Sequence, residues 1–413
     1  KGYGMQIGQD PESVEQTTRA VRAVTKKIIE VKFGVMPNLL ASVKAAIKGG
    51  ADRIVLINTD GPGYYSIDGQ DILYNPNNGV GGISGESLFP KLLKAVRDVR
   101  KEFKDIPITA CGGIFGANQI RELLYHNVDE FAIGTAQGGM TMLEVINHYK
   151  TILKDLENGT DVASGLIKKI DLTLKPVTIT KVERDACDFA VYRTDKSIQA
   201  KPGQFAFAFL PGNMMPDKRP SEKPFSIVDN DPLTFAVQAV GHFTERFNQL
   251  QPGDKFYFRG PYGQPIEVPD NSDIAIILGG CGLAAGLLPA KVFSRKAKSI
   301  NILIGARDKE HLALLREFEK YGEVYTAYEN SSGRNKLVTD LFGPQLRQGT
   351  YFINCGPKPM INAVLPLEFA LTSPNRILTS QEYLTRCGAG ICGKCINPRG
   401  EKTCVEGPFM QHK

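Results

Sequence analysis

Four cysteines near the C-terminus have the residue type and the spacing of a redox cluster site. They follow the pattern C-x4-C-x2-C-x8-C at Cys387, Cys392, Cys395 and Cys404. The first three match the spacing that holds a [2Fe-2S] cluster in ferredoxins. Glycines between them let the backbone turn tightly, so that amide N–H groups can point at sulfur. A structural zinc site is the alternative, because four-cysteine zinc sites also use C-x2-C pairs.

A candidate pyrophosphate site lies upstream, where an apolar strand at 273–278 leads into a glycine turn and a helix at 283–295. The turn carries Gly280 and Gly282. Free amides at a helix N-terminus after such a turn suit a dinucleotide phosphate. The turn lacks the G-x-G-x-x-G fingerprint, so it is a moderate signal by itself.

Two later strands are expected at 300–304 and 351–354. They end near Arg307 and near Cys355-Gly356. A doubly wound sheet binds its ligand at the loops after its strands. These residues are therefore candidates for the same dinucleotide site.

The region before this sheet is typical of a small antiparallel β-barrel. Short alternating apolar runs at 177–182, 205–209, 233–237 and 255–258 are separated by Pro-Gly and Asp-Pro turns. A flavin and its diphosphate could use Lys223 and Ser226 on one strand, and the Gly241 amide and Thr244 hydroxyl at the start of a short helix. The alternative at each position is an ordinary turn, whose polar groups hydrogen-bond within the turn and bind no ligand.

The first 155 residues alternate strands and helices as βα units do. The expected strands are 28–32, 53–58, 106–110 and 130–134. Four units make half of a (β/α)8 barrel, which needs eight units and about 250 residues. Such barrels carry their function at the carboxyl ends of the strands.

Several residues at these strand ends could bind a ligand. Gly112-Gly113 and Gly134-Thr135 follow consecutive strands, and their amides could hold a flavin phosphate. The alternative is that the glycines only permit a tight turn. Lys32, Asn58 and Thr59 also lie at strand ends, where Lys32 could instead be a solvated charge.

The order of these motifs resembles the flavin barrels of dihydroorotate dehydrogenase and dihydropyrimidine dehydrogenase. The matching pieces are Gly50-Ala51-Asp52, Ile57-Asn58-Thr59, Gly81-Gly82-Ile83-Ser84-Gly85, Cys111-Gly112-Gly113-Ile114 and Ile133-Gly134-Thr135-Ala136. The resemblance implies that Lys32 faces the flavin ring and that Asn58 and Thr59 contact substrate. It implies an FMN site surrounded by Gly81, Gly82, Gly112, Gly113, Gly134 and Thr135.

The resemblance covers about the second half of that family's barrel and omits the loop that carries the family's catalytic base. No catalytic residue is therefore assigned. We expect either a second polypeptide or residues upstream of Lys1 to complete the barrel, within an oligomeric assembly.

From about residue 173 to the end, the chain resembles ferredoxin-NADP reductase-like modules, most closely the electron-transfer subunit of class 1B dihydroorotate dehydrogenase. The motifs that carry this resemblance are the flavin strand, Gly260-Pro261-Tyr262-Gly263, the glycine turn, Cys355-Gly356-Pro357 and the four cysteines. It implies FAD at Lys223, Phe225, Ser226, Gly241 and Thr244, and NAD(H) at Gly280, Gly282, Arg307, Cys355 and Gly356. Lys223 stands where the family usually has arginine, which removes a bidentate phosphate contact.

The expected fold class is mixed α/β and β. It comprises a half (β/α)8 barrel at 1–155, a linker at 156–172, an FAD-binding antiparallel β-barrel at 173–270, a doubly wound NAD-binding domain at 271–372 and a [2Fe-2S] domain at 373–413. A net charge of +6 scattered over 413 residues argues against nucleic-acid binding. The chain has no apolar run of membrane-spanning length, and its isolated remaining cysteines indicate a reducing cytoplasm.

The expected function is an NAD-linked oxidoreductase that interconverts dihydroorotate and orotate through FAD, the cluster and FMN. One alternative is an electron-transfer partner whose half barrel is a docking module. Another is a pyrimidine reductase similar to dihydropyrimidine dehydrogenase. The direction, the substrate and the choice between NAD and NADP stay open.

Overall fold

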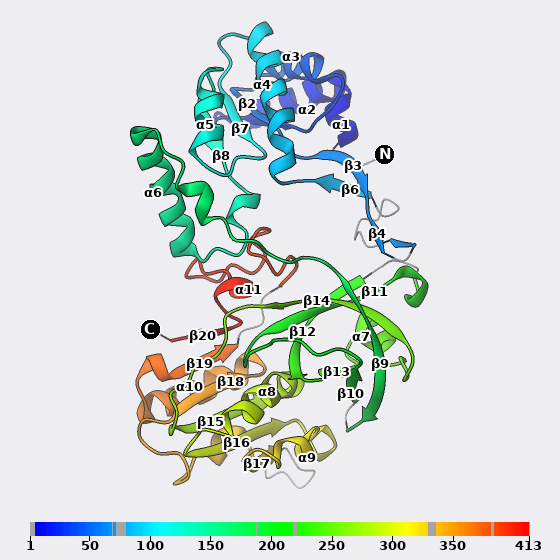
Figure 1. The fold of residues 1–413 in the computed structure, drawn as a ribbon, viewed down its shortest axis with the longest axis vertical. Coiled ribbons are helices and arrows are strands. Elements are labelled where there is room, and N and C mark those ends of the chain that lie inside the picture. The colour runs from blue at the N-terminus through cyan, green and yellow to red at the C-terminus, as the bar shows by residue number, and fades with distance from the viewer. Residues whose placement is uncertain are drawn as a thin grey trace. The chain divides into compact units, whose positions relative to one another are not determined.

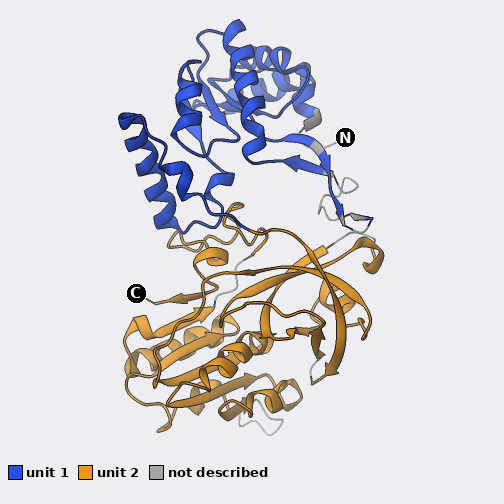
Figure 2. Ribbon diagram, in the orientation of Figure 1, with its two compact units in different colours: residues 1–170 blue, residues 171–413 orange. Residues whose placement is uncertain are grey.

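The computed structural model describes residues 5–67, 69–71, 80–186, 188–217, 221–328, 336–380 and 384–412. The chain forms two compact units, unit 1 at Lys1–Ile170 and unit 2 at Asp171–Lys413 (Figure 2). The division falls within the polar connector expected at 156–172. Each unit has its own buried hydrophobic core.

Unit 1 is built on a parallel sheet with the strand order β1-β2-β7-β8 (Figure 1). The strands are β1 Glu30–Phe33, β2 Arg53–Leu56, β7 Ile108–Cys111 and β8 Glu130–Ala132. Helices follow the strands as crossovers, because parallel neighbours cannot be joined by a tight turn. The helices are α2 Pro11–Val24, α3 Leu39–Gly49, α4 Phe89–Glu102, α5 Ala117–Leu124 and α6 Met142–Asn158. This arrangement confirms the four βα units expected from the sequence.

Local sequence signals set the ends of these helices. Helix α6 begins at a capping box, in which the Thr141 hydroxyl accepts from the Glu144 N–H and the Glu144 carboxylate accepts from the Thr141 N–H. It ends at Gly159, which has a φ of 72°. Helix α3 ends in the same way at Gly50, whose φ is 98°. A short α1, Met5–Gln9, precedes these helices.

A small antiparallel pair lies between β2 and α4 and was not expected from the sequence. It consists of β3, Asp60–Tyr64, and β6, Val80–Ile83, with the two-residue strands β4 Ser66–Ile67 and β5 Gln70–Asp71 near it in the chain. Glycines fill β3 and β6, so they lack the alternating apolar pattern that predicts strands.

Unit 2 begins with a closed antiparallel barrel of six strands, which confirms the barrel expected at 173–270. Its strand order is β10-β13-β12-β11-β14-β9. The strands are β9 Lys175–Arg184, β10 Phe189–Thr194, β11 Phe205–Leu210, β12 Ser221–Asn230, β13 Leu233–Gln238 and β14 Lys255–Tyr262. Buried Phe235, Phe247 and Phe256 pack with one another inside it, and the short helix α7, His242–Phe247, supplies Phe247.

A six-stranded sheet with the order β17-β16-β15-β18-β19-β20 follows the barrel. The strands are β15 Asp273–Gly279, β16 Ser299–Ala306, β17 Glu323–Tyr328, β18 Tyr351–Cys355, β19 Ile377–Ser380 and β20 Phe409–Gln411. All pairs are parallel except β19 with β20. The strand order reverses at β15, which makes the β15/β18 boundary the expected ligand site of a doubly wound sheet. Strands β19 and β20 carry this sheet past the boundary expected at residue 372.

Helix α8, Leu283–Phe293, is buried on almost every side. Leu288 packs into the hydrophobic core of the barrel, whereas Leu283 and Leu287 pack into the core of the sheet. The remaining helices of unit 2 are α9 Leu315–Phe318, α10 Lys358–Leu371 and α11 Thr403–Glu406. In the described part of the chain, every helix is too short or too polar to cross a membrane.

Candidate functional site

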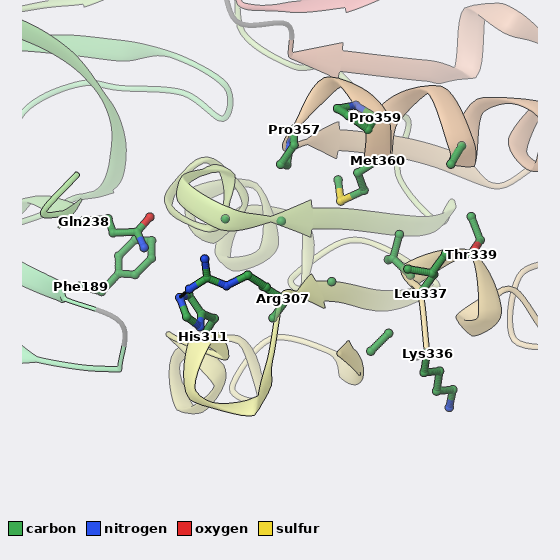
Figure 3. Close-up of a pocket in the computed structure, with 17 residues that line it drawn as sticks. Phe189, Gln238, Arg307, His311, Lys336, Leu337, Thr339, Pro357, Pro359 and Met360 are labelled. Carbon is green, nitrogen blue, oxygen red and sulfur yellow. Dashed lines mark hydrogen bonds between the residues drawn. The ribbon is translucent and has the colours of Figure 1, made fainter. Parts of the chain in front are cut away.

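The larger cavity of unit 2, about 610 Å³, lies at the carboxyl ends of β15, β16 and β18. Gly279, Gly280 and Gly305 contribute backbone to its wall, and Arg307 reaches it from the end of β16 (Figure 3). A Cβ on Gly279 would lie 2.7 Å from the Met360 sulfur, so a side chain there would displace Met360. The structure therefore places Gly280 and Arg307 together, as the sequence predicted.

The Arg307 side chain is held by a neighbouring histidine and aspartate. Its Nη2 lies 2.6 Å from Nε2 of His311 (Figure 3). Nδ1 of His311 contacts the Asp308 carboxylate. The hydrogen bond from His311 lowers the pKa of Asp308 below its usual range. This chain of contacts fixes a guanidinium at the cavity wall, where it can receive an anionic phosphate.

A second cavity, about 280 Å³, lies between the barrel and the end of β18. Six of the predicted residues line it: Phe225, Ser226, Thr244, Gly282, Cys355 and Gly356. A Cβ on Gly282 would lie 2.4 Å from the Cys355 carbonyl oxygen. Only glycine at position 282 therefore lets the turn pass the end of β18.

The two cavities share two lining residues, Phe189 on β10 and Gln238 on β13. A flavin ring in the smaller cavity and a nicotinamide dinucleotide in the larger one would therefore be neighbours. Phe189 was not predicted because β10 lacks alternation, since its first four residues are all buried, and Gln238 lies one residue beyond the run expected at 233–237. A continuous apolar run of that length does not distinguish a strand from a buried helix.

Two predicted flavin residues, Thr244 and Lys223, have surroundings that change their expected roles. The Thr244 hydroxyl is already occupied, since it accepts from the N–H groups of Val240 and Gly241 and donates to the Gly241 carbonyl. It therefore shapes the turn at Gly241. Lys223 is exposed on β12 and lies outside the lining of both cavities.

Three of the four C-terminal thiols are in contact. The Sγ atoms of Cys395 and Cys404 lie 3.2 Å apart, and Cys404 also hydrogen-bonds Cys387. Cys392 is exposed. No three His, Cys, Asp or Glu side chains in the described ranges are spaced to share one metal ion.

The backbone around these thiols nevertheless fits a negatively charged sulfur site. The amide of Ala389 lies 3.4 Å from Sγ of Cys387, and the amide of Gly390 lies 3.2 Å from Sγ of Cys404. The Cys404 hydrogen bond and neighbouring amides lower the pKa of Cys387 to about 4. Gly388, Gly390 and Gly393 all have positive φ, as the predicted tight turns require. Thiols of low pKa with backbone amides directed at sulfur are the kinds of group that bind a [2Fe-2S] cluster.

Unit 1 gathers part of its predicted site at the carboxyl ends of its strands. Nζ of Lys32 lies 3.7 Å from Sγ of Cys111, so β1 and β7 contribute to one spot. The Asn58 N–H donates to the Phe33 carbonyl, 2.8 Å away. A Cβ on Gly82 would lie 2.4 Å from the Thr59 hydroxyl oxygen, which places Gly82 against Thr59.

The glycine loops of unit 1 differ from one another. Gly112 and Gly113 have φ values of 118° and 72°, and a Cβ on Gly113 would lie 2.4 Å from the Phe89 nitrogen. Gly134 and Thr135 are exposed, and Gly134 has open space around it. Gly81 lies on β6, opposite Gly63. Exposed amides beside packed glycines fit a phosphate or a flavin edge.

Tyr149 on α6 is an additional residue near this end of the sheet. Its hydroxyl accepts from Nε2 of Gln137, 2.7 Å away, and burial raises its pKa. Gln137 follows the predicted Gly134-Thr135 loop in the turn Thr135–Gln137. No motif pointed to Tyr149, because its contact depends on how α6 packs.

Comparisons with known proteins agree with this division into two parts. A family model described as dihydroorotate dehydrogenase matches residues 1–154. A protein of Thermococcus kodakarensis named as a dihydroorotate dehydrogenase B (NAD(+)) electron transfer subunit is 32% identical over 237 residues, which are 57% of this chain and 95% of that protein. A protein of Methanocaldococcus jannaschii with the same name is 32% identical over 242 residues, 57% of this chain and 90% of that protein.

Among solved structures, an NADH-dependent reduced ferredoxin-NADP oxidoreductase is 24% identical, with a TM-score of 0.49, and the match covers 57% of this chain and 87% of that one.

Proposed function

Because this chain belongs to the family of dihydroorotate dehydrogenase B electron transfer subunits, we propose that it passes electrons between NAD(H), FAD, a [2Fe-2S] cluster and FMN to interconvert dihydroorotate and orotate. The single observation that carries the proposal is the pair of adjoining cavities in unit 2. They share Phe189 and Gln238. Gly280 and Arg307 line the larger cavity, and the predicted flavin residues Phe225, Ser226 and Thr244 line the smaller one together with Gly282, Cys355 and Gly356.

When bound, NAD(H) and the flavins supply two-electron hydride exchange, and a cluster supplies single-electron transfer. The residues of this chain provide binding and orientation. Arg307, held by His311, receives the dinucleotide phosphates. Phe225 and Ser226 line the flavin cavity, and glycine at position 282 lets the turn pass close to the Cys355 carbonyl at the cavity wall.

The four cysteines would hold the cluster, with the amides of Ala389 and Gly390 stabilising sulfur charge. In unit 1, Lys32 and the loops after β2, β7 and β8 would hold FMN and substrate. We propose that further strands on a second polypeptide complete this site, because β1 and β8 are the open edges of the four-stranded sheet.

A cofactor and turnover assay tests the proposal. The purified chain should contain FAD, iron and acid-labile sulfide, and it should oxidise NADH with an artificial electron acceptor. Addition of a polypeptide that completes the barrel should add FMN and orotate-dependent NADH oxidation. A chain that binds zinc and no iron would contradict the cluster.

The role of Arg307 can be tested in the same assay. Arg307→Gln should raise the KM for NADH about tenfold, because one charge-assisted phosphate contact is worth roughly 1.5 kcal/mol. Arg316→Gln is the matched control, since Arg316 is exposed on α9 and lies outside the lining of the cavity. An equal change in both variants would count against the assignment.

The open sheet also favours a second candidate function, in which unit 1 is a docking module and the chain delivers NADH electrons to a separate enzyme. That chain would reduce the artificial acceptor but would never bind FMN, even with a completing polypeptide present. A pyrimidine reductase similar to dihydropyrimidine dehydrogenase would instead oxidise NADH with a pyrimidine other than orotate.

A further inference from the structure

A buried ion pair lies on the wall of the antiparallel barrel. Arg259 on β14 places Nε 2.5 Å and Nη2 2.8 Å from the two carboxylate oxygens of Glu222 on β12. The side chains are only 9% and 5% exposed. Burying such a pair has a large desolvation cost, and a hydrophobic pair of similar volume is often as stable or more stable. Stability alone therefore gives little reason for a charged pair at this position.

The rest of the Arg259 guanidinium faces the cysteine loop. Nη1 donates to the carbonyl of Cys387, 2.8 Å away, and Nη2 lies 3.4 Å from the carbonyl of Arg386. The guanidinium carbon lies 4.0 Å from the centre of the Phe207 ring, which covers one face of it. Arg259 thus joins the barrel to the loop that carries the first of the four cysteines.

The loop packs closely against the same part of the barrel. A Cβ on Gly388 would lie 2.8 Å from the Phe207 ring and 3.1 Å from the Tyr262 ring. The Tyr262 hydroxyl donates to the Asp171 carbonyl, 2.7 Å away, and lies 3.3 Å from Nη1 of Arg259. With close packing on one side and a charged hydrogen bond on the other, the position of Cys387 is fixed relative to the barrel.

We propose that Glu222 and Arg259 form a positioning pair that fixes Cys387 against the flavin barrel and sets the reduction potential of the cysteine-bound cluster. This inference rests on the proposed cluster. A positive charge beside a cluster ligand stabilises the reduced cluster, which carries one more negative charge, and the Glu222 carboxylate offsets part of that effect. The two members of the pair therefore act on the potential in opposite directions.

The test measures the midpoint potential of the cluster, together with iron and FAD content, in the full chain. Arg259→Met should make the potential more negative, and Glu222→Gln should make it more positive. Arg259→Lys keeps the charge and should restore most of the potential lost in Arg259→Met. The double variant Arg259→Met with Glu222→Met should fall between the two single variants, and it avoids leaving a buried charge unpaired.

A matched control is available on the same barrel. Arg193 and Glu183 form an ion pair of 2.7 Å between β10 and β9. Among the described residues, the side-chain hydrogen bonds of this pair do not reach the cysteine loop. Arg193→Met and Glu183→Gln should leave the potential unchanged.

The outcomes separate this inference from the proposed function. Unchanged potentials in the Arg259 and Glu222 variants, or shifts of the same sign in both, would overturn the positioning role while leaving the cluster in place. A wild-type chain without iron would overturn both. If Arg259→Met fails to fold, the sign of the shift in Glu222→Gln decides.

Discussion

The two units place their candidate sites at the carboxyl ends of parallel strands, but only unit 2 adds a closed barrel, which has no edge strands. Its sheet has a central strand, β15, that is buried along nearly its whole length, and an edge strand, β17, that is only partly buried. In unit 1 the edge strands β1 and β8 are only partly buried, although parallel sheets are normally covered on both faces. Edge strands present unpaired backbone groups that can recruit another chain.

Both units expose some large apolar side chains, and in unit 2 Val240 is 70% exposed. Val24, Ile28, Leu143 and Leu153 of unit 1 are 84%, 68%, 66% and 62% exposed. Leu143 and Leu153 lie on α6, whose opposite face is buried. Scattered exposed leucines are normal, but a helix with two apolar faces indicates a surface that packs against something else. The exposed apolar face of α6 and the part-buried strands β1 and β8 are therefore the surfaces of unit 1 suited to packing against another chain.

The largest expected effect tests whether the two units also differ in how tightly they pack at their candidate ligand sites. Among the glycines predicted to bind ligands, Gly113 in unit 1 and Gly282 in unit 2 have no room for a side chain, whereas Gly134 and Gly241 have open space. Gly113→Ala should cost about 4 kcal/mol, because overpacking adds to the strain of a positive φ. Gly282→Ala should also destabilise, through overpacking alone. Thermal unfolding of the cofactor-free chain measures both.

Gly134→Ala and Gly241→Ala are the controls and should change the thermal midpoint little. Tolerance at Gly113 combined with intolerance at Gly282 would mean that unit 1 is loosely packed at its site as well as at its edges.

The next effect compares the two faces of α6. Ile152 is 3% exposed and its chain neighbour Leu153 is 62% exposed. Ile152→Ala should lower the stability of unit 1 by about 3.5 kcal/mol through a cavity, and Leu153→Ala should change it by less than about 0.5 kcal/mol. Calorimetry of the isolated chain measures both. Loss of stability in Leu153→Ala would show that this face is already covered, and would break the comparison between the units.

Much of the fold could be predicted from the sequence, because strong periodic patterns depend on local residues. The strands around 53–58 and 273–278 and the helix at 283–295 were expected close to where β2, β15 and α8 lie. The missed elements have weak local patterns. Strand β6 contains two adjacent glycines, and β20 has three residues. Those strands form because their partner strands, β3 and β19, are in place.

The candidate site was predictable where it uses backbone, and less so where it uses side-chain packing. Gly282 and Cys355 were identified from turns at strand ends, and they line one cavity. Phe189, Gln238 and His311 were not identified, because nothing in their neighbours in the chain indicates that they face a cavity. Residues brought together by the tertiary fold leave no spacing pattern in the sequence.

The smallest expected effect compares exposed, ion-paired carboxylates in unit 1 with a buried carboxyl group in unit 2. In unit 1 the Arg53 guanidinium pairs with the exposed carboxylates of Glu30 and Glu130. In unit 2 Glu368 on α10 is fully buried, and Nδ2 of Asn354 donates to its carboxylate over 2.9 Å. Burial raises the pKa of Glu368 from 4.5 to about 7.

Between pH 4.5 and 7 the unfolded chain releases the Glu368 proton while the folded chain keeps it, so unfolding becomes easier as the pH rises. Unit 2 should lose roughly 3 kcal/mol across this range, at 1.36 kcal/mol for each pKa unit. Glu368→Gln should remove that loss and unfold at a higher temperature than wild type at pH 8, but not at pH 4. Glu319→Gln, exposed on the same unit, is the control. If the unfolding temperature of Glu368→Gln changes with pH in parallel with that of wild type, titration of Glu368 does not contribute to the pH dependence of unit 2.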